Sequence, residues 1–219
     1  MRITLVVILY SFLFTYICAQ HEDIIHLINP SFEDTPKQSS PPTGWTDCGF
    51  QWESPPDVHP GNYWEVDTKP HHGKSYLGMV VRNNGTWECI SQMLLFPMDA
   101  GHCYEFSIYL AMSGHYLSGI TNRSQLPRVT RSDSTYNFST PAIIRIWGGD
   151  SVCERKEMLE QSNPIDHQDW KKYKFTFRPK STLRYIVLEA YYSTNKSTPY
   201  NGNILLDNAS DIMRLPDKE

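Results

Sequence analysis

The feature that most restricts the fold of this sequence is a repeated alternation, with period two, of apolar and polar residues. In residues 103–112 every second side chain is large and apolar, and the row between these side chains is more polar. Residues 170–177 and 183–192 alternate in the same way. Because successive side chains of a strand point to opposite faces, this pattern predicts strands that each have one buried face.

Turn residues separate these segments and indicate further strands. The run Asn83-Asn84-Gly85 is typical of a hairpin turn and lies between two strand-like segments. Residues 151–161 have a helical composition, and we expect one short helix there. The sequence therefore predicts an all-β fold, an antiparallel β-sandwich of about eight or nine strands with one short helix. We expect the first and last strands to pair and close the sandwich. The predicted strands are residues 24–28, 75–82, 86–95, 103–112, 142–147, 170–177, 183–192 and 204–206.

The first nineteen residues are predicted to be a secretory signal peptide. Arg2 precedes an apolar run over residues 3–16, and the small residue Ala19 precedes Gln20. The run is shorter than the roughly 20 apolar residues that span a bilayer, which disfavours a membrane anchor. A lipid-modified Cys18 is a further alternative. Residues 20–219 are then expected to form a single domain that is secreted or held at the cell surface, with no second apolar segment.

Charge and cysteine content narrow the environment of this domain. The formal net charge is −4 and there is no basic stripe, so nucleic acid and anionic membrane surfaces are poor partners. An even number of cysteines in an exported chain predicts disulfides, and spacing does not choose among the three possible pairings. We favour Cys48 with Cys89 and Cys103 with Cys153. A zinc site is the alternative, but the sequence has no C-x-x-C pair.

Six short motifs in a fixed order carry a resemblance to a known family. They follow one another over nearly all of residues 20–219, and together they resemble the family of carbohydrate-binding modules with a galactose-binding-like jelly-roll fold. Residues 48–82 and 147–170 are similar to a subgroup of exported bacterial surface proteins, some of which are associated with gliding motility. The motifs are NPSFE at 29–33, PxGW at 42–45, GKSYL at 73–77, ISQxL at 90–94, GxxYxFS at 101–107 and LDN at 206–208.

The resemblance implies a structural Ca²⁺ where the two ends of the chain meet. The side chains of Glu33 and Asp207 and backbone carbonyls near Asn29 and Lys74 would bind it. Two carboxylates with carbonyls are a reasonable set for Ca²⁺, which takes six to eight oxygen ligands. The alternative is that the two carboxylates cap turns or pair with neighbouring lysines.

A possible glycan-binding surface is predicted on the outward faces of three strands. Sugars present C–H faces and hydroxyl groups, so a receptor needs aromatic rings beside planar hydrogen-bonding groups. Aromatic residues of a loop form a second candidate. The alternative is that such residues simply have a high strand propensity. The strand candidates are Ser107, Tyr109, Arg145, Trp147, Glu189 and Tyr191, and the loop candidates are Trp52, Tyr63 and Trp64.

Catalytic patterns are weak in this sequence. It has no G-x-S-x-G nucleophile motif. Glu105 and Glu189 would suit glycoside hydrolysis only if they faced each other at about 5–10 Å. The sequence therefore predicts a non-catalytic module that binds a glycan or cell-surface polysaccharide. The alternatives are an adhesion or assembly module that binds surface proteins, and an enzyme on the same fold. An open groove lined by Tyr109, Trp147 and Tyr191 would favour the first.

Overall fold

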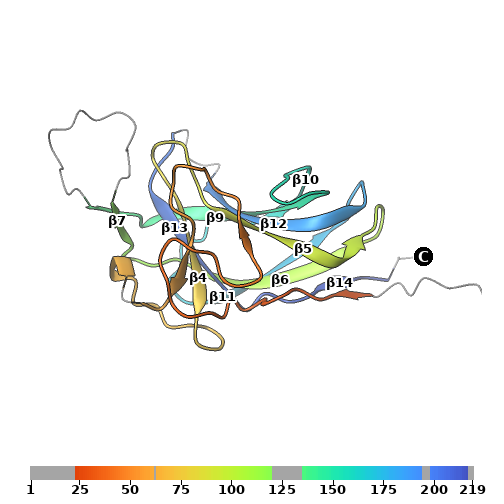
Figure 1. Ribbon diagram of the computed structural model, residues 1–219, viewed down its shortest axis with the longest axis horizontal. Helices are drawn as coiled ribbons and strands as arrows, with labels where there is room; N and C mark the ends of the chain where they lie inside the picture. The colour runs from red at the N-terminus through yellow and green to blue at the C-terminus, as the bar shows by residue number, and fades with distance from the viewer. Residues whose placement is uncertain (1–22, 62, 120–134, 194–197, 217–219) are drawn as a thin grey trace, which may run out of the picture.

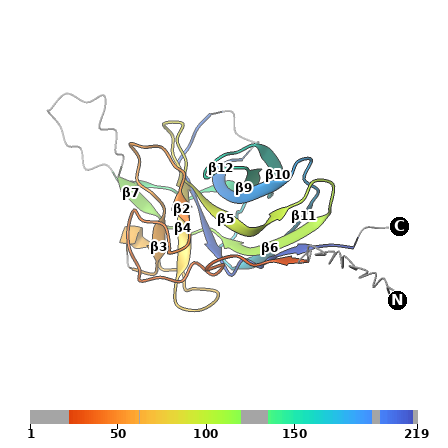
Figure 2. The same ribbon diagram turned by 45° about the vertical axis from the view of Figure 1, so that its right-hand side comes forward.

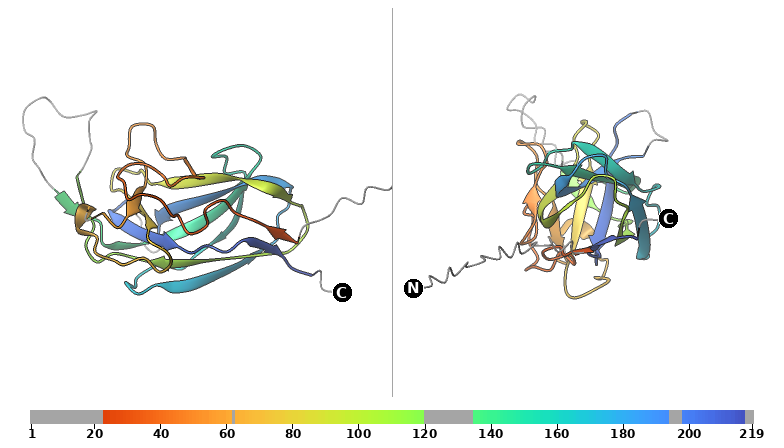
Figure 3. Two further views of the ribbon diagram at one scale, coloured as in Figure 1. Left: turned by 60° about the horizontal axis from the view of Figure 1, so that its bottom comes forward. Right: turned by 90° about the vertical axis from the view of Figure 1, so that its right-hand side faces the viewer.

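Two β-sheets packed face to face form this protein (Figures 1 and 2). The computed structural model describes residues 23–61, 63–119, 135–193 and 198–216, so the predicted signal peptide lies outside the described residues. Figure 3 shows the two layers from the side. Pairing is antiparallel throughout except where β13 meets β9 and joins the two sheets at one place. The all-β antiparallel sandwich predicted from the alternation is confirmed.

The first sheet is built around β6, which has neighbours on both edges. Strand β11 pairs with one edge of β6, and β13 and β14 follow one another along the other edge. Strands β4 and β3 extend the sheet beyond β13, and β1 pairs with β14. The bounds are β1 Ile24–Ile25, β3 Asp57–His59, β4 Tyr76–Val81, β6 Tyr104–Ala111, β11 Lys171–Phe177, β13 Gly202–Asp207 and β14 Ile212–Arg214.

The second sheet has the order β10, β9, β12, β5 and β2. A separate hairpin of β7 and β8 lies at one end of the sandwich, opposite the end that holds β14 (Figure 1). One short 3-10 helix, η1, follows β3. The bounds are β2 Thr46–Asp47, β5 Cys89–Met98, β7 Leu117–Gly119, β8 Thr135–Asn137, β9 Thr140–Gly149, β10 Glu157–Gln161, β12 Leu183–Tyr192 and η1 Tyr63–Glu65.

The main core lies between the sheets and is made by the apolar rows that the alternation predicts. Phe106, Ile108 and Leu110 of β6 are fully buried, as are Ile186 and Leu188 of β12. Burying a side chain of this size stabilises the fold by about 1.5–3 kcal/mol. The opposite row of each strand therefore faces outward, and any binding surface on a sheet has to be sought there.

The helix predicted at residues 151–161 is wrong. The second half of this segment is the strand β10, which pairs with the edge of β9 and places Met158 opposite Trp147. Leu159 turns inward and is buried in the core. Pairing satisfies the backbone groups of an otherwise open edge of β9, and this tertiary gain outweighs the local helical preference.

The chain ends do lie side by side, but not through the strand that the sequence suggested. Ile24 and Ile25 pair with Met213 and Ile212 of β14. The predicted closing strand at 204–206 is part of β13, which lies inside the first sheet between β6 and β4. Its burial on both faces is consistent with its unbroken apolar sequence.

One disulfide joins Cys48 to Cys153, so neither pairing favoured from the sequence is present. Cys89 is a buried free thiol and Cys103 is a half-buried one. Cys48 does lie next to Cys89, because the backbone N–H of Cys48 donates to the carbonyl of Cys89 at 2.9 Å. The loop before β10 nevertheless brings Cys153 to a Cα–Cα distance of 5.2 Å from Cys48, which suits a disulfide.

Within the described ranges, none of the helical structure is long and apolar enough to cross a bilayer.

Candidate binding face on the second sheet

Four of the predicted glycan-binding residues gather on the outer face of the second sheet. Strands β9 and β12 pair so that Arg145 lies directly opposite Glu189. Trp147 and Tyr191 lie two positions further along their strands, on the same face. Arg145, Trp147 and Tyr191 are each half-buried, whereas Glu189 is only 1% exposed.

Glu189 is the internal anchor of this face rather than a free ligand group. The indole N–H groups of Trp87 and Trp147 each donate to one of its carboxylate oxygens at 2.8 Å. The Nε atom of Arg155 lies 2.8 Å from Oε1 of the same carboxylate. A buried charge needs such partners, because water no longer solvates it. Glu189 therefore fixes the positions of two tryptophans and one arginine.

A row of aromatic rings extends from this anchor toward solvent. The ring of Tyr191 lies 4.8 Å from that of Trp87, which lies 5.1 Å from that of Phe50. Phe50 lies 6.1 Å from Trp52, whose side chain is 72% exposed. We call Tyr191, Trp87, Phe50 and Trp52 the aromatic row. Its exposed end and half-buried rings offer the flat apolar surface on which sugar rings stack.

Sequence reasoning missed two members of the aromatic row, Trp87 and Phe50. Trp87 lies in the segment predicted as a strand, two residues before Cys89, so the alternation places both on one side of that strand. That signal was available for Trp87. Nothing local marks Phe50, because its position beside Trp87 depends on how the loop from Cys48 folds over the sheet.

The remaining predicted residues lie elsewhere, so the three strands do not form one surface. Strand β6 belongs to the first sheet; there Ser107 is buried, and the ring of Tyr109 stacks on His71 at 3.6 Å. Trp64 also lies on that side and donates its indole N–H to Asp57. Glu105, on β6, pairs with Lys174 at 2.7 Å. Glu105 and Glu189 therefore do not face one cleft.

A buried polar cluster that the sequence did not reveal lies on the outer face of the first sheet. Asp57 of β3 accepts hydrogen bonds from the hydroxyl of Tyr116 at 2.7 Å, the indole of Trp64 at 3.0 Å and the backbone N–H of Ser39 at 2.7 Å. Only donors surround this carboxylate, although burial raises its pKa. The segment was read as a proline-rich loop, and its signal is the alternation of Asp57 and His59 around Val58.

His59 lies in the same cluster without a hydrogen-bond partner. Its side chain is fully buried, its ring stacks on Tyr76 at 5.3 Å, and neither ring nitrogen is hydrogen-bonded to any described residue. Gly78 makes room for it, because a Cβ there would lie 2.8 Å from Nε2 of His59. Burial lowers the pKa of His59 to about 4.

The stability difference between the wild type and a His59→Leu variant is expected to depend on pH. The folded state resists protonation of His59, whereas the unfolded chain takes up the proton near pH 6.5. The contribution of His59 to the free energy of unfolding should thus fall by about 3 kcal/mol between pH 7 and pH 4. Leucine cannot titrate and does not reach as far toward Gly78.

Urea denaturation of both proteins across this pH range would measure the effect. The difference between them has to be used, because burial raises the pKa of Glu88 to about 8 and this group acts with the opposite sign. A difference in stability that does not change with pH would contradict the assignment of a neutral, buried His59.

The predicted calcium ligands meet at one loop, where hydrogen bonds already engage both carboxylates. Asp207 accepts from the backbone N–H groups of His71 and His72 at 2.8 and 2.9 Å and from the hydroxyl of Ser31 at 2.9 Å. Glu33 accepts from the backbone N–H of Lys74. The described residues include no group of three or more His, Cys, Asp or Glu placed to hold a metal. These donors close the loop without an ion, and the calcium site stays a prediction.

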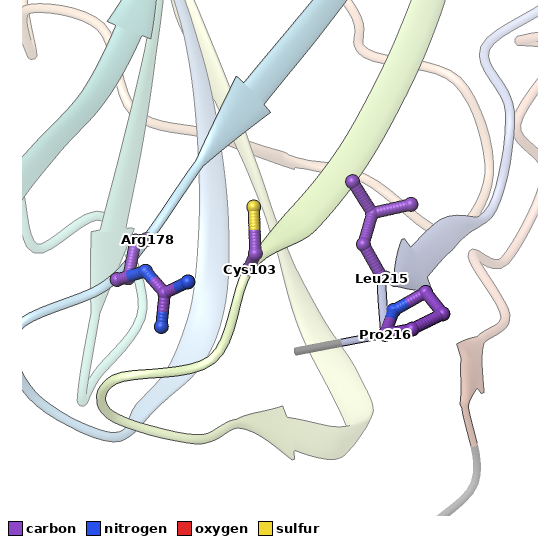
Figure 4. A pocket seen from close by; sticks show the side chains of 4 residues that line it. All are labelled: Cys103, Arg178, Leu215 and Pro216. Atoms are coloured by element: carbon purple, nitrogen blue, oxygen red, sulfur yellow. The ribbon is translucent and has the colours of Figure 1, made fainter. Parts of the chain in front are cut away.

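A pocket of about 540 Å³ lies away from the binding face, at the end of the sandwich near β14. Figure 4 shows the free thiol of Cys103 between Arg178 on one side and Leu215 and Pro216 on the other. None of these residues was predicted as a ligand-binding residue, and none belongs to the aromatic row.

The comparisons with known proteins bear on the fold. No protein-family model matches the sequence, and no curated protein matches it. A cyclase from Fischerella sp. TAU is similar with a TM-score of 0.54 at 12% identity, over 90% of this chain and 98% of that chain.

Two structures from carbohydrate-active proteins are also similar. The arabinose-bound MgGH51 α-L-arabinofuranosidase matches with a TM-score of 0.53 at 11% identity, over 88% of this chain and 26% of that chain. The CBM22-1 xylan-binding domain of Paenibacillus barcinonensis Xyn10C matches with a TM-score of 0.44 at 14% identity, over 86% of this chain and 93% of that chain. At these identities, what the cyclase and the arabinofuranosidase share with this protein is the β-sandwich fold.

Proposed function

We propose that this chain is a non-catalytic module that binds a glycan on the outer face of its second sheet. The observation that carries the proposal is the aromatic row, which ends in the exposed Trp52 and begins beside the half-buried pair of Arg145 and Tyr191. Rings offer stacking to sugar C–H faces, and the guanidinium offers hydrogen bonds. Export to the cell surface and a structural Ca²⁺ belong to the same proposal.

Trp52→Ala is expected to abolish or strongly weaken glycan binding while leaving the melting temperature unchanged. The side chain is 72% exposed, so its loss removes stacking area without opening a cavity in the core. The test is a glycan-array screen of residues 20–219, with and without Ca²⁺, followed by titration of each hit against the variant. Trp147 is unsuitable for this purpose because its indole holds Glu189.

Tyr136→Ala is the matched control. Tyr136 is also an exposed aromatic residue, at 42%, but it lies in the β7–β8 hairpin and outside the aromatic row. Its loss should leave glycan binding intact. Silence of the folded wild type across the array would contradict the proposed function, and so would equal losses in the two variants.

A specific observation favours a protein-binding module as the second candidate. Strand β5 exposes Met93 and Leu95, both at 59%, and Phe96 at 42%. A row of exposed apolar side chains on one strand is typical of a surface that contacts protein. Retention of a surface protein by the wild type, lost on Leu95→Asp and kept on Trp52→Ala, would favour this candidate.

A further inference from the structure

Arg145 lacks a carboxylate partner, and this bears on the kind of glycan that the proposed binding face accepts. The strand register places Glu189 directly opposite Arg145, where an opposite charge would normally pair across two strands. Glu189 instead accepts hydrogen bonds from two indoles and pairs with Arg155. The nearest carboxylate by register is therefore already compensated by another guanidinium.

The groups that do contact Arg145 are neutral. Its Nε atom donates to the side-chain oxygen of Gln161 on β10 at 3.3 Å, and its guanidinium carbon lies 3.5 Å from the centre of the Tyr191 ring. Among the described residues, no Asp or Glu forms an ion pair or hydrogen bond with it. The face thus carries one positive charge that the fold does not balance.

Stacking also fixes how this charge is presented. A guanidinium that lies on an aromatic ring keeps its planar N–H edge free to donate within its own plane. The Nε–Gln161 bond uses one donor and leaves the two terminal nitrogens. Two parallel N–H groups match the two oxygens of a carboxylate, and such bidentate pairs are among the stronger hydrogen bonds in proteins.

From this geometry we infer that the binding face selects an anionic glycan whose sugar carries a carboxylate, that is, a uronate-containing chain. The inference rests on the proposed function and specifies its ligand. The Arg145 fork binds the uronate carboxylate, and Tyr191 with the rest of the aromatic row supports the sugar rings. A neutral glycan would leave the guanidinium without a partner as water is displaced from the face.

Calorimetric titration of residues 20–219 with an oligogalacturonate and with its methyl ester tests the inference. The two probes have the same backbone, and only the first carries charge. We expect the acid to bind roughly ten- to hundredfold more tightly than the ester, as hydrogen bonds to a charged group imply. Arg145→Gln should remove this preference, and Arg145→Lys, which keeps the charge without the fork, should restore only part of it.

Arg184→Gln is the matched control, because Arg184 is an exposed arginine of the same strand, β12, and takes no part in the site. Equal binding of acid and ester would overturn the inference and leave the proposed function standing. Tighter binding of a sulfated oligosaccharide than of any uronate would overturn the choice of a carboxylate. Absence of binding to every glycan, charged or neutral, would contradict the proposed function itself.

Discussion

Replacing Cys48 and Cys153 together by serine is expected to lower the free energy of unfolding by about 4 kcal/mol. The disulfide joins residues 105 positions apart, and a cross-link over a loop of that length restricts the unfolded chain strongly. Changing both cysteines is necessary, because a lone Cys48 would remain beside the buried thiol of Cys89. Urea denaturation of the variant and the wild type under non-reducing conditions measures the change.

The matched control for this prediction is Cys103→Ser, which changes a half-buried free thiol. It should cost far less, because no cross-link is lost. Peptide mapping of the unreduced protein should also recover Cys48 joined to Cys153. Recovery of Cys48 joined to Cys89, or equal stability losses in the two variants, would contradict the described pairing.

Glu189→Ala is expected to destabilise the protein by about 3–5 kcal/mol. The change leaves the indole N–H groups of Trp87 and Trp147 without their acceptor and Arg155 without its counter-charge. Breaking one side of a buried charged network costs more than its net contribution, because the remaining partners stay desolvated. Thermal and urea unfolding would show the loss, and near-ultraviolet circular dichroism would report the freed tryptophans.

Glu105→Ala is the control for this second prediction. Glu105 also pairs with a cation, Lys174, but its side chain is partly exposed and that of Lys174 is largely exposed. Surface pairs of this kind contribute about 0–1 kcal/mol. If Glu105→Ala and Glu189→Ala destabilised the protein equally, Glu189 would not be the buried anchor of the binding face.

Much of the fold could be predicted because its strands carry a local signal. The alternation in residues 103–112 marks the buried row of β6, and Phe106, Ile108 and Leu110 lie in the core as expected. Residues 151–161 show where such reasoning fails. Their composition favours a helix, but the open edge of β9 recruits the segment as β10. Local preference is weak compared with pairing to a strand that already exists.

The candidate site could be predicted only in part, for a similar reason. Alternation correctly assigns Arg145, Trp147 and Tyr191 to an outward row, but it does not say which strands are neighbours. Tyr109 was therefore grouped with residues of the other sheet. The role of Glu189 as an anchor depends on Trp87 and Arg155, which come from distant parts of the chain. Long-range partners of this kind leave no trace in local spacing.

The position of the disulfide has a consequence for the second sheet as a whole. Cys48 follows β2 and Cys153 precedes β10, and these strands are the opposite edges of that sheet (Figure 2). The bond therefore ties the two edges together across the outer face, like a strap over a curved plate. A sheet held in this way cannot flatten, so its curvature is set before any ligand arrives. A rigid receptor loses little conformational freedom on binding, which favours recognition of one ligand shape over adaptation to many.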